Sequence, residues 1–108
     1  MSKEKETTKE LNKEKLKALQ LTLDKLEKIV EEAGYVLRYE RGTFQSGYCI
    51  LEQKKVVVLN KFLQTEGRIN TLLDLMPQLE IRFELLSEES KKLYSGINSK
   101  LAAKENNN

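Results

Sequence analysis

The chain has 108 residues, of which 39% are hydrophobic and 33% charged, and this suits one small globular domain. Its formal net charge of +2 is too small to imply nucleic acid or a membrane surface as a partner. Without histidine and with a single cysteine, it lacks the residues for histidine-dependent nucleophiles, Cys/His zinc sites or an intramolecular disulfide. We expect no cofactor, no metal and no catalytic site, and we favour a protein that is not an enzyme.

Both ends of the chain are polar. Residues 1–9 and 102–108 are predicted to be disordered tails that flank a single α+β domain at 10–101. No apolar segment resembles a secretory signal or reaches the roughly 20 residues that a membrane-spanning helix needs. We therefore expect a cytoplasmic protein with no membrane contact.

A long helix is predicted from about Glu10 to Ala33. Its apolar residues recur at steps of three and four along one stripe, formed by Leu16, Leu19, Leu23, Leu26, Val30 and Ala33. Gly34 follows where a left-handed conformation commonly ends a helix. The stripe also has heptad spacing over fewer than three heptads, so a dimeric coiled coil is an alternative. We favour packing of the stripe on the domain's own sheet.

Residues 35–61 have a local net charge of +3 and are rich in β-branched and aromatic residues. Three strands are predicted, at 35–39, 46–52 and 56–59. Gly42 marks the first turn, and Gln53-Lys54 the second. Because the third segment is apolar on both faces, it predicts a central strand. We expect a three-stranded antiparallel β meander.

Two C-terminal helices are predicted around Pro77, the only proline. Asn60 or Thr65 is expected to cap the first of them. Its buried side is formed by Leu63, Ile69, Leu72, Leu73 and Met76. The last helix is expected to start at Ser87. Residues 79–86 fit either helical or strand spacing, and we favour a short extended segment.

Seven residues of the β region form a candidate surface patch: Arg38, Tyr39, Arg41, Tyr48, Cys49, Lys54 and Lys61. Aromatic rings for base stacking and cations for phosphates are the means by which small sheets bind single-stranded nucleic acid. We favour the alternative in which the rings lie in the core and the charges are solvated.

The glycine spacing and the single cysteine are both explained by structure rather than by catalysis or ligand binding. Gly42 and Gly47 have the glycine spacing of a P-loop, but Tyr48 and Cys49 stand where that motif needs Lys and Ser or Thr, so we reject it. Cys49 lies among apolar residues and is expected in the core rather than as a reactive thiol.

The middle of the chain also carries a recognisable motif. It consists of Arg38-Tyr39-Glu40, Gly42, Phe44, Gly47-Tyr48-Cys49 and Asn60-Lys61. This motif resembles that of a group of small uncharacterised bacterial proteins, which have a double glycine where this chain has Ser46-Gly47. The resemblance implies a bacterial origin and no particular activity. The order of strand, strand, Asn-Lys and helix is also similar to small zincin-like peptidases, and it implies a scaffold without its metal because HExxH is missing.

We favour a bacterial protein that acts through a protein interface, with a protein partner or as a homodimer. The first alternative is a weak nucleic-acid binder that uses Arg38, Tyr39, Arg41, Tyr48 and Lys54. The second is an enzyme or small-molecule binder that uses Cys49, Tyr48 and Arg41. Nucleic acid is disfavoured as a partner but left open.

Overall fold

A computed structural model describes residues 2–51 and 53–106, with side chains described at 12–50 and 53–100. The elements in chain order are α1 (Ser2–Glu32), β1 (Tyr35–Glu40), β2 (Gly47–Leu51), β3 (Lys54–Asn60), α2 (Thr65–Leu75) and α3 (Glu88–Asn106). Two short 3-10 turns, η1 (Met76–Gln78) and η2 (Phe83–Leu85), connect α2 to α3. The predicted α+β class with an N-terminal helix is confirmed. The predicted strand end at Glu52 and the outermost tail residues, 1 and 107–108, lie outside the described residues.

The sheet is mixed, which corrects the prediction of an antiparallel meander. Its strand order is β1-β3-β2, with β3 parallel to β1 and antiparallel to β2. Residues 41–46, here called the crossover, therefore pass the end of β3 and carry the chain from one edge of the sheet to the other. Because β3 is apolar on both faces, it takes the central position between two neighbours. The prediction of a central strand at 56–59 is confirmed.

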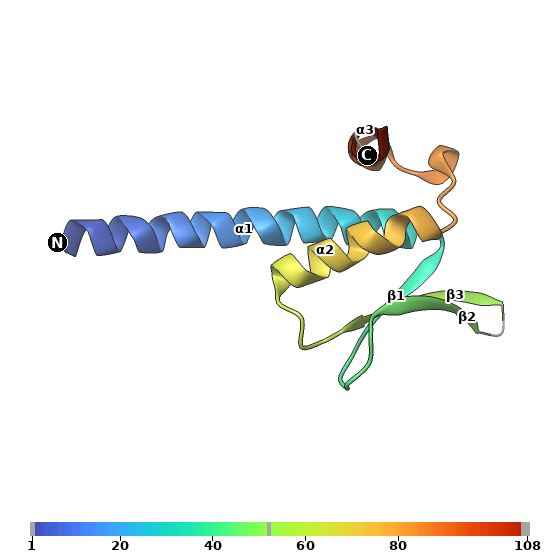
Figure 1. The fold of residues 1–108 in the computed structure, drawn as a ribbon, viewed down its shortest axis with the longest axis horizontal. Helices are drawn as coiled ribbons and strands as arrows, with labels where there is room; N and C mark the ends of the chain where they lie inside the picture. Colours follow the sequence, from blue (N-terminus) through green and yellow to red (C-terminus); the bar gives the residue numbers. More distant parts are fainter. Residues whose placement is uncertain (1, 52, 107–108) are drawn as a thin grey trace.

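The helices lie on one side of the sheet (Figure 1). α1 and α2 cover one face, and α3 lies on the side of α1 away from the sheet. The most deeply buried side chains come from α1, β3, α2 and η1 and are Leu23, Leu26, Ile29, Val30, Val57, Leu59, Leu72 and Met76. In the described part of the chain, no helix lies over the opposite face of the sheet (Figure 1).

α1 extends well beyond the sheet (Figure 1). Its apolar stripe is buried from Leu23 onward, whereas Leu16 is 59% exposed. The packing of the stripe on the domain is thus confirmed only for its C-terminal part. α1 includes residues 2–9, for which the composition indicates a tail, and the division into tails and one domain stays a prediction.

The helix ends follow the local sequence with one exception. Gly34 has φ +92° directly after α1, in the left-handed region that glycine accepts without strain, as predicted. Pro77 lies in η1 at the end of α2, also as predicted. The predicted cap of α2 is wrong, because Gln64 occupies the cap position without a side-chain hydrogen bond. Residues 79–86 are extended at Leu79 and Arg82 but form the turn η2 between them and α3.

Candidate functional site

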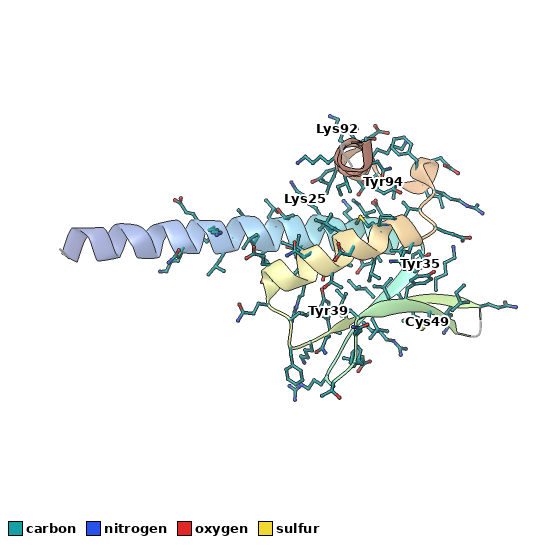
Figure 2. All side chains as sticks on the ribbon, in the orientation of Figure 1. Lys25, Tyr35, Tyr39, Cys49, Lys92 and Tyr94 are labelled. Atoms are coloured by element: carbon teal, nitrogen blue, oxygen red, sulfur yellow. The ribbon has the colours of Figure 1, made fainter. Side chains whose placement is uncertain are left out.

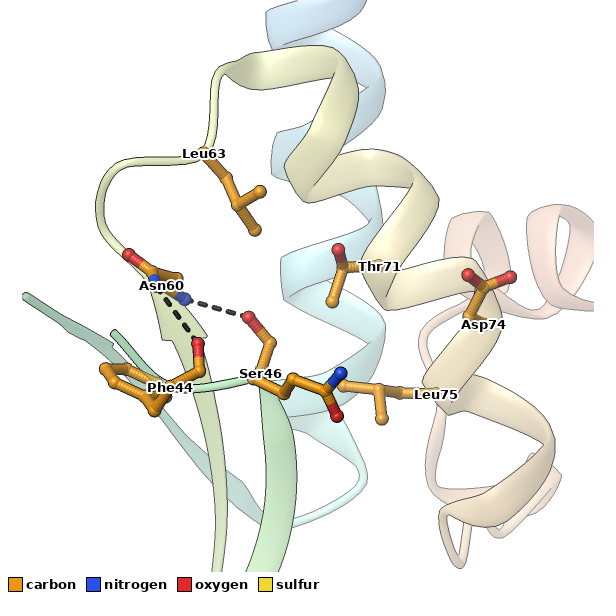
Figure 3. Close-up of a pocket in the computed structure, with 8 residues that line it drawn as sticks. Phe44, Ser46, Asn60, Leu63, Thr71, Asp74 and Leu75 are labelled. Atoms are coloured by element: carbon orange, nitrogen blue, oxygen red, sulfur yellow. Dashed lines mark hydrogen bonds between the residues drawn. The ribbon is translucent and has the colours of Figure 1, made fainter. Parts of the chain in front are cut away.

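Asn60 fastens the crossover to the end of β3 (Figure 3). Its backbone N–H donates to Ser46 Oγ at 2.9 Å. Its Nδ2 donates to the carbonyl oxygens of Gly42 and Phe44 at 2.9 and 3.1 Å. Its Oδ1 accepts a hydrogen bond from the Phe62 N–H at 3.0 Å. Since the amide is used on both its donor and its acceptor side, Asn60 holds the fold together rather than awaiting a ligand.

A cavity of about 400 Å³ lies between the crossover and α2 (Figure 3). Its lining consists of Phe44, Gln45, Ser46, Asn60, Leu63, Thr71, Asp74 and Leu75. The volume falls in the range of small-molecule sites. However, Thr71 Oγ already donates to the Gly67 carbonyl at 2.8 Å, and Asn60 is occupied as described above. Two of the polar side chains that line the cavity are therefore already used in the fold.

Tyr39 of β1 connects the sheet to both helices that cover it, α1 and α2. Its hydroxyl donates to Glu27 Oε2 of α1, and the Arg68 guanidinium of α2 lies 4.4 Å from the centre of its ring. Arg68 also donates to the carbonyls of Leu63 and Lys61 at 2.9 and 3.0 Å, which fixes the β3–α2 loop. Burial, followed by the Glu27 carboxylate, raises the pKa of Tyr39 well above its ordinary value. The phenol therefore stays a hydrogen-bond donor at physiological pH.

Tyr35 makes a second connection on the same side. Its hydroxyl accepts a hydrogen bond from the Glu80 N–H at 2.8 Å, and Lys55 Nζ lies 5.4 Å from the centre of its ring. Lys55 also pairs with the Glu80 carboxylate at 2.8 Å, which lowers the pKa of that exposed acid. Figure 2 shows Tyr35 and Tyr39 between the sheet and the helices. Both rings therefore contribute to the fold.

The start of α3 is bound to the end of α1 through Glu32. Its Oε1 accepts hydrogen bonds from the Ser87 N–H at 3.2 Å and from Ser87 Oγ at 3.4 Å. Burial raises the pKa of Glu32, but hydrogen bonds from Ser90 and Ser87 and the charge of Lys28 outweigh it, so the pKa lies below the ordinary value. The ionised carboxylate thus accepts the N–H of Ser87, the residue before α3, at the helix end where negative charge is favourable.

The seven residues of the predicted patch do not form one surface. Tyr39 and Tyr48 are on the helix side of the sheet, where Tyr39 is held by Glu27 and Arg68, whereas Arg38 and Cys49 alternate to the opposite side. Arg41 belongs to the crossover. Lys54 is the first residue of β3, and Lys61 follows its last residue. The structure thus divides the patch between two faces and the two ends of the sheet.

The helix-free face of the sheet has an apolar centre. We call this surface the open face; it consists of Val36, Arg38, Cys49, Val56 and Val58. Its rows follow from the strand register, in which Val56 lies between Val36 and Cys49, and Val58 lies between Arg38 and Gly47. Val36 is 45% exposed. The open face adjoins the outer edge of β2, where Tyr48 and Ile50 point to the helix side and are 42% and 67% exposed.

Cys49 is exposed, so the prediction that it lies in the core is wrong. It alternates to the open face of an edge strand, while the helices cover the other face (Figure 2). A run of apolar neighbours indicates burial only where both faces of a strand are covered. The helices cover only one face of the sheet, and Cys49 lies on the other.

No group of acidic, histidine or cysteine side chains that could hold a metal ion occurs among the described residues. Within the same part of the chain, no helix is long and apolar enough to cross a membrane. No protein-family model, curated protein or solved structure matches the chain.

The sequence did not predict the structural roles of Asn60 and Arg68 or the exposure of Ile50. Asn60 was assigned to a helix cap, and its role in the crossover depends on a strand order that local patterns do not reveal. Arg68 stacks on Tyr39 from a different element. Ile50 carries a detectable signal, because Gly47–Leu51 is the only one of the three strands without a charged residue.

Proposed function

We propose that this protein is non-enzymatic and acts through a protein interface formed by the open face and the adjoining edge of β2. The observation that carries the proposal is the exposure of apolar side chains on both edge strands, with Val36 on the open face of β1 and Tyr48 and Ile50 on the helix side of β2. Arg38 and Lys54 border them on the same sheet. Apolar patches with a polar border commonly mark protein interaction sites.

The two alternatives have less support. A nucleic-acid site needs rings that bases can stack on, but Arg68 covers the ring of Tyr39 and Glu27 holds its hydroxyl, which leaves Tyr48 as the one exposed ring of the two tyrosines in that alternative. A thiol-dependent site needs a place for a substrate, and Cys49 is not among the residues that line the 400 Å³ cavity. The exposure of Cys49 fits a residue of a protein interface as well as it fits a reactive thiol.

The proposal is tested by capturing proteins from extracts of the cells that make this chain. The immobilised protein is compared with Val36→Lys on the open face, Ile50→Lys at the β2 edge and Leu85→Lys as a matched control. Leu85 is as exposed as these residues but lies in η2, away from the sheet. We expect the wild type and Leu85→Lys to retain the same protein, and one of the sheet variants to lose it.

Binding is then measured with the purified partner, or with the chain itself if that is what is captured. The proposal would be contradicted by two results together. The chain would be a monomer at every concentration, and no captured protein would be lost on substitution of Val36 or Ile50. Tight, salt-sensitive retention of single-stranded nucleic acid would favour the first alternative instead.

A further inference from the structure

β2 is an edge strand without the usual protection against pairing. Its sequence, Gly-Tyr-Cys-Ile-Leu, contains no charge and no proline, although one side of its backbone faces away from the sheet. Natural edge strands commonly carry lysine, proline or a bulge, which prevent another strand from adding to them. The other edge, β1, carries Arg38 and Glu40. The two edges therefore differ in their readiness to accept a further strand.

We propose that β2 pairs antiparallel with β2 of a second copy of this chain. The inference rests on the proposed function and names its partner. A two-fold interface brings each patch against itself, so a charged patch would repel its own copy. β2 meets this requirement because it carries no charge. The neutrality of the strand is what selects a second copy over a peptide of opposite charge.

The register of this pairing follows from the length of the strand. β2 has five residues, so the antiparallel register that pairs all of them is centred on Cys49. Opposed residues share a face of the sheet, which places each Tyr48 opposite Ile50 of the second copy on the helix side. Pairs of an aromatic and a β-branched residue are among the favourable cross-strand pairs. The exposed side chains of Tyr48 and Ile50 thus cover each other twice.

The same register brings the two Cys49 residues together on the open face. Directly opposed residues of antiparallel strands have Cα atoms roughly 4.5 to 5.5 Å apart, which lies within the range of a disulfide. The result is one six-stranded sheet in which both sets of helices lie on one side and both open faces form one continuous surface. Because only five residues of each chain pair, the dimer is weak and depends on protein concentration.

The first test is sedimentation velocity in a reducing buffer, from low micromolar to near-millimolar protein. We expect a monomer–dimer equilibrium in the wild type. Ile50→Lys removes both Tyr–Ile pairs and should weaken association by roughly tenfold or more. Val36→Lys also replaces an exposed apolar residue by lysine, but on the other edge strand, and should leave association unchanged.

The second test uses Cys49 as a reporter. Diamide is added, and it takes up the two electrons and two protons that two thiols lose when they form a disulfide. We expect a cross-linked dimer on a non-reducing gel, formed much more slowly in Ile50→Lys. A Cys49→Ser/Gln45→Cys variant carries an equally exposed thiol in the crossover, and in the proposed dimer these thiols are on the order of 25 Å apart. It should cross-link at the rate of random collision only.

The outcomes separate this inference from the proposed function. A monomer at all concentrations, or a dimer in which the thiols at positions 45 and 49 cross-link equally fast, overturns β2 pairing. A dimer that survives Ile50→Lys overturns it as well, and points to another surface such as the exposed part of α1. In each of these cases the proposed function is still supported if the chain captures a different protein and Val36→Lys abolishes that capture.

Discussion

The two faces of the sheet come from the same three strands but are held in different ways. On the helix side, Tyr35 and Tyr39 each bond to a residue of another element, and Val57 and Leu59 are fully buried. On the open face, Val36 and Cys49 are exposed. Because side chains alternate along a strand, these two sets occupy neighbouring positions in the sequence.

This difference shows how one segment of 27 residues, 35–61, can serve both the fold and a partner. The residues that connect the strands to other elements lie at alternate positions, on the face that contacts the helices. Of the residues between them, Val36, Arg38 and Cys49 are exposed, whereas Val56 is buried. Substitutions one position apart should therefore have very different consequences, and the following experiments compare matched substitutions on the two faces.

The largest difference is expected between two valines. Val57→Ala removes two methyl groups from a fully buried side chain and should lower the free energy of unfolding by about 2–3 kcal/mol. Val36→Ala makes the same change on the open face and should cost less than about 1 kcal/mol. Urea denaturation followed by circular dichroism measures both. Equal losses would mean that Val36 is buried in solution, and they would contradict the difference in burial between the two faces.

A smaller loss is expected at the end of the sheet, where the crossover joins the two edges. Asn60→Ala removes the hydrogen bonds to Gly42, Phe44 and Phe62 and should cost about 2 kcal/mol. Asn70→Ala changes an exposed asparagine of α2 and should leave stability unchanged or slightly raised, since alanine favours helix. Hydrogen exchange should show the loss of protection concentrated at 41–46 and 60–62. If protection is unchanged there, another group holds the crossover.

The secondary structure was largely predictable, whereas the sheet topology was not. Leu23, Leu26 and Val30 follow helical spacing, and Gly34 marks the end of α1, because these signals act within a few residues. The apolar run at 56–59 also indicated a central strand. The parallel pairing of β1 with β3, in contrast, depends on contacts between residues about twenty positions apart. Spacing along the chain carries no information on such pairing.

The composition of the candidate surface was not predictable from the sequence. Val36, Tyr48 and Ile50 are exposed, whereas Tyr39 belongs to the Glu27 and Arg68 contacts. Cys49 was assigned to the core because its neighbours are apolar, and only the position of β2 at an edge explains its exposure. Which face a strand residue takes is readable from alternation, but which face the helices cover is decided by tertiary packing.

Tyr39 and Tyr48 allow a comparison of a bonded and an exposed tyrosine on the helix side of the sheet. Tyr39→Phe leaves the ring in place but removes the hydrogen bond to Glu27, and should cost about 1–2 kcal/mol because the acceptor is charged and half-buried. Tyr48→Phe makes the same change on an exposed ring and should be neutral within about 0.5 kcal/mol. Thermal denaturation of the two variants measures the difference. A Tyr39→Phe protein as stable as the wild type would show that Arg68 stacking alone holds this ring.

The smallest effect, and the only one that depends on pH, concerns the contact between α1 and α3, which lies farthest from the sheet. The pKa of Glu32 is lowered below 4.5 in the folded state, so its stabilising contribution is complete above the unfolded pKa and is lost as the pH falls through the folded pKa. The stability difference between wild type and Glu32→Gln should be constant near neutral pH and shrink under acidic conditions. Glu31→Gln changes an exposed neighbour and should follow the wild-type profile. A constant difference down to the acid transition would mean that the ionised carboxylate does not hold Ser87, and that α3 is attached through its apolar residues alone.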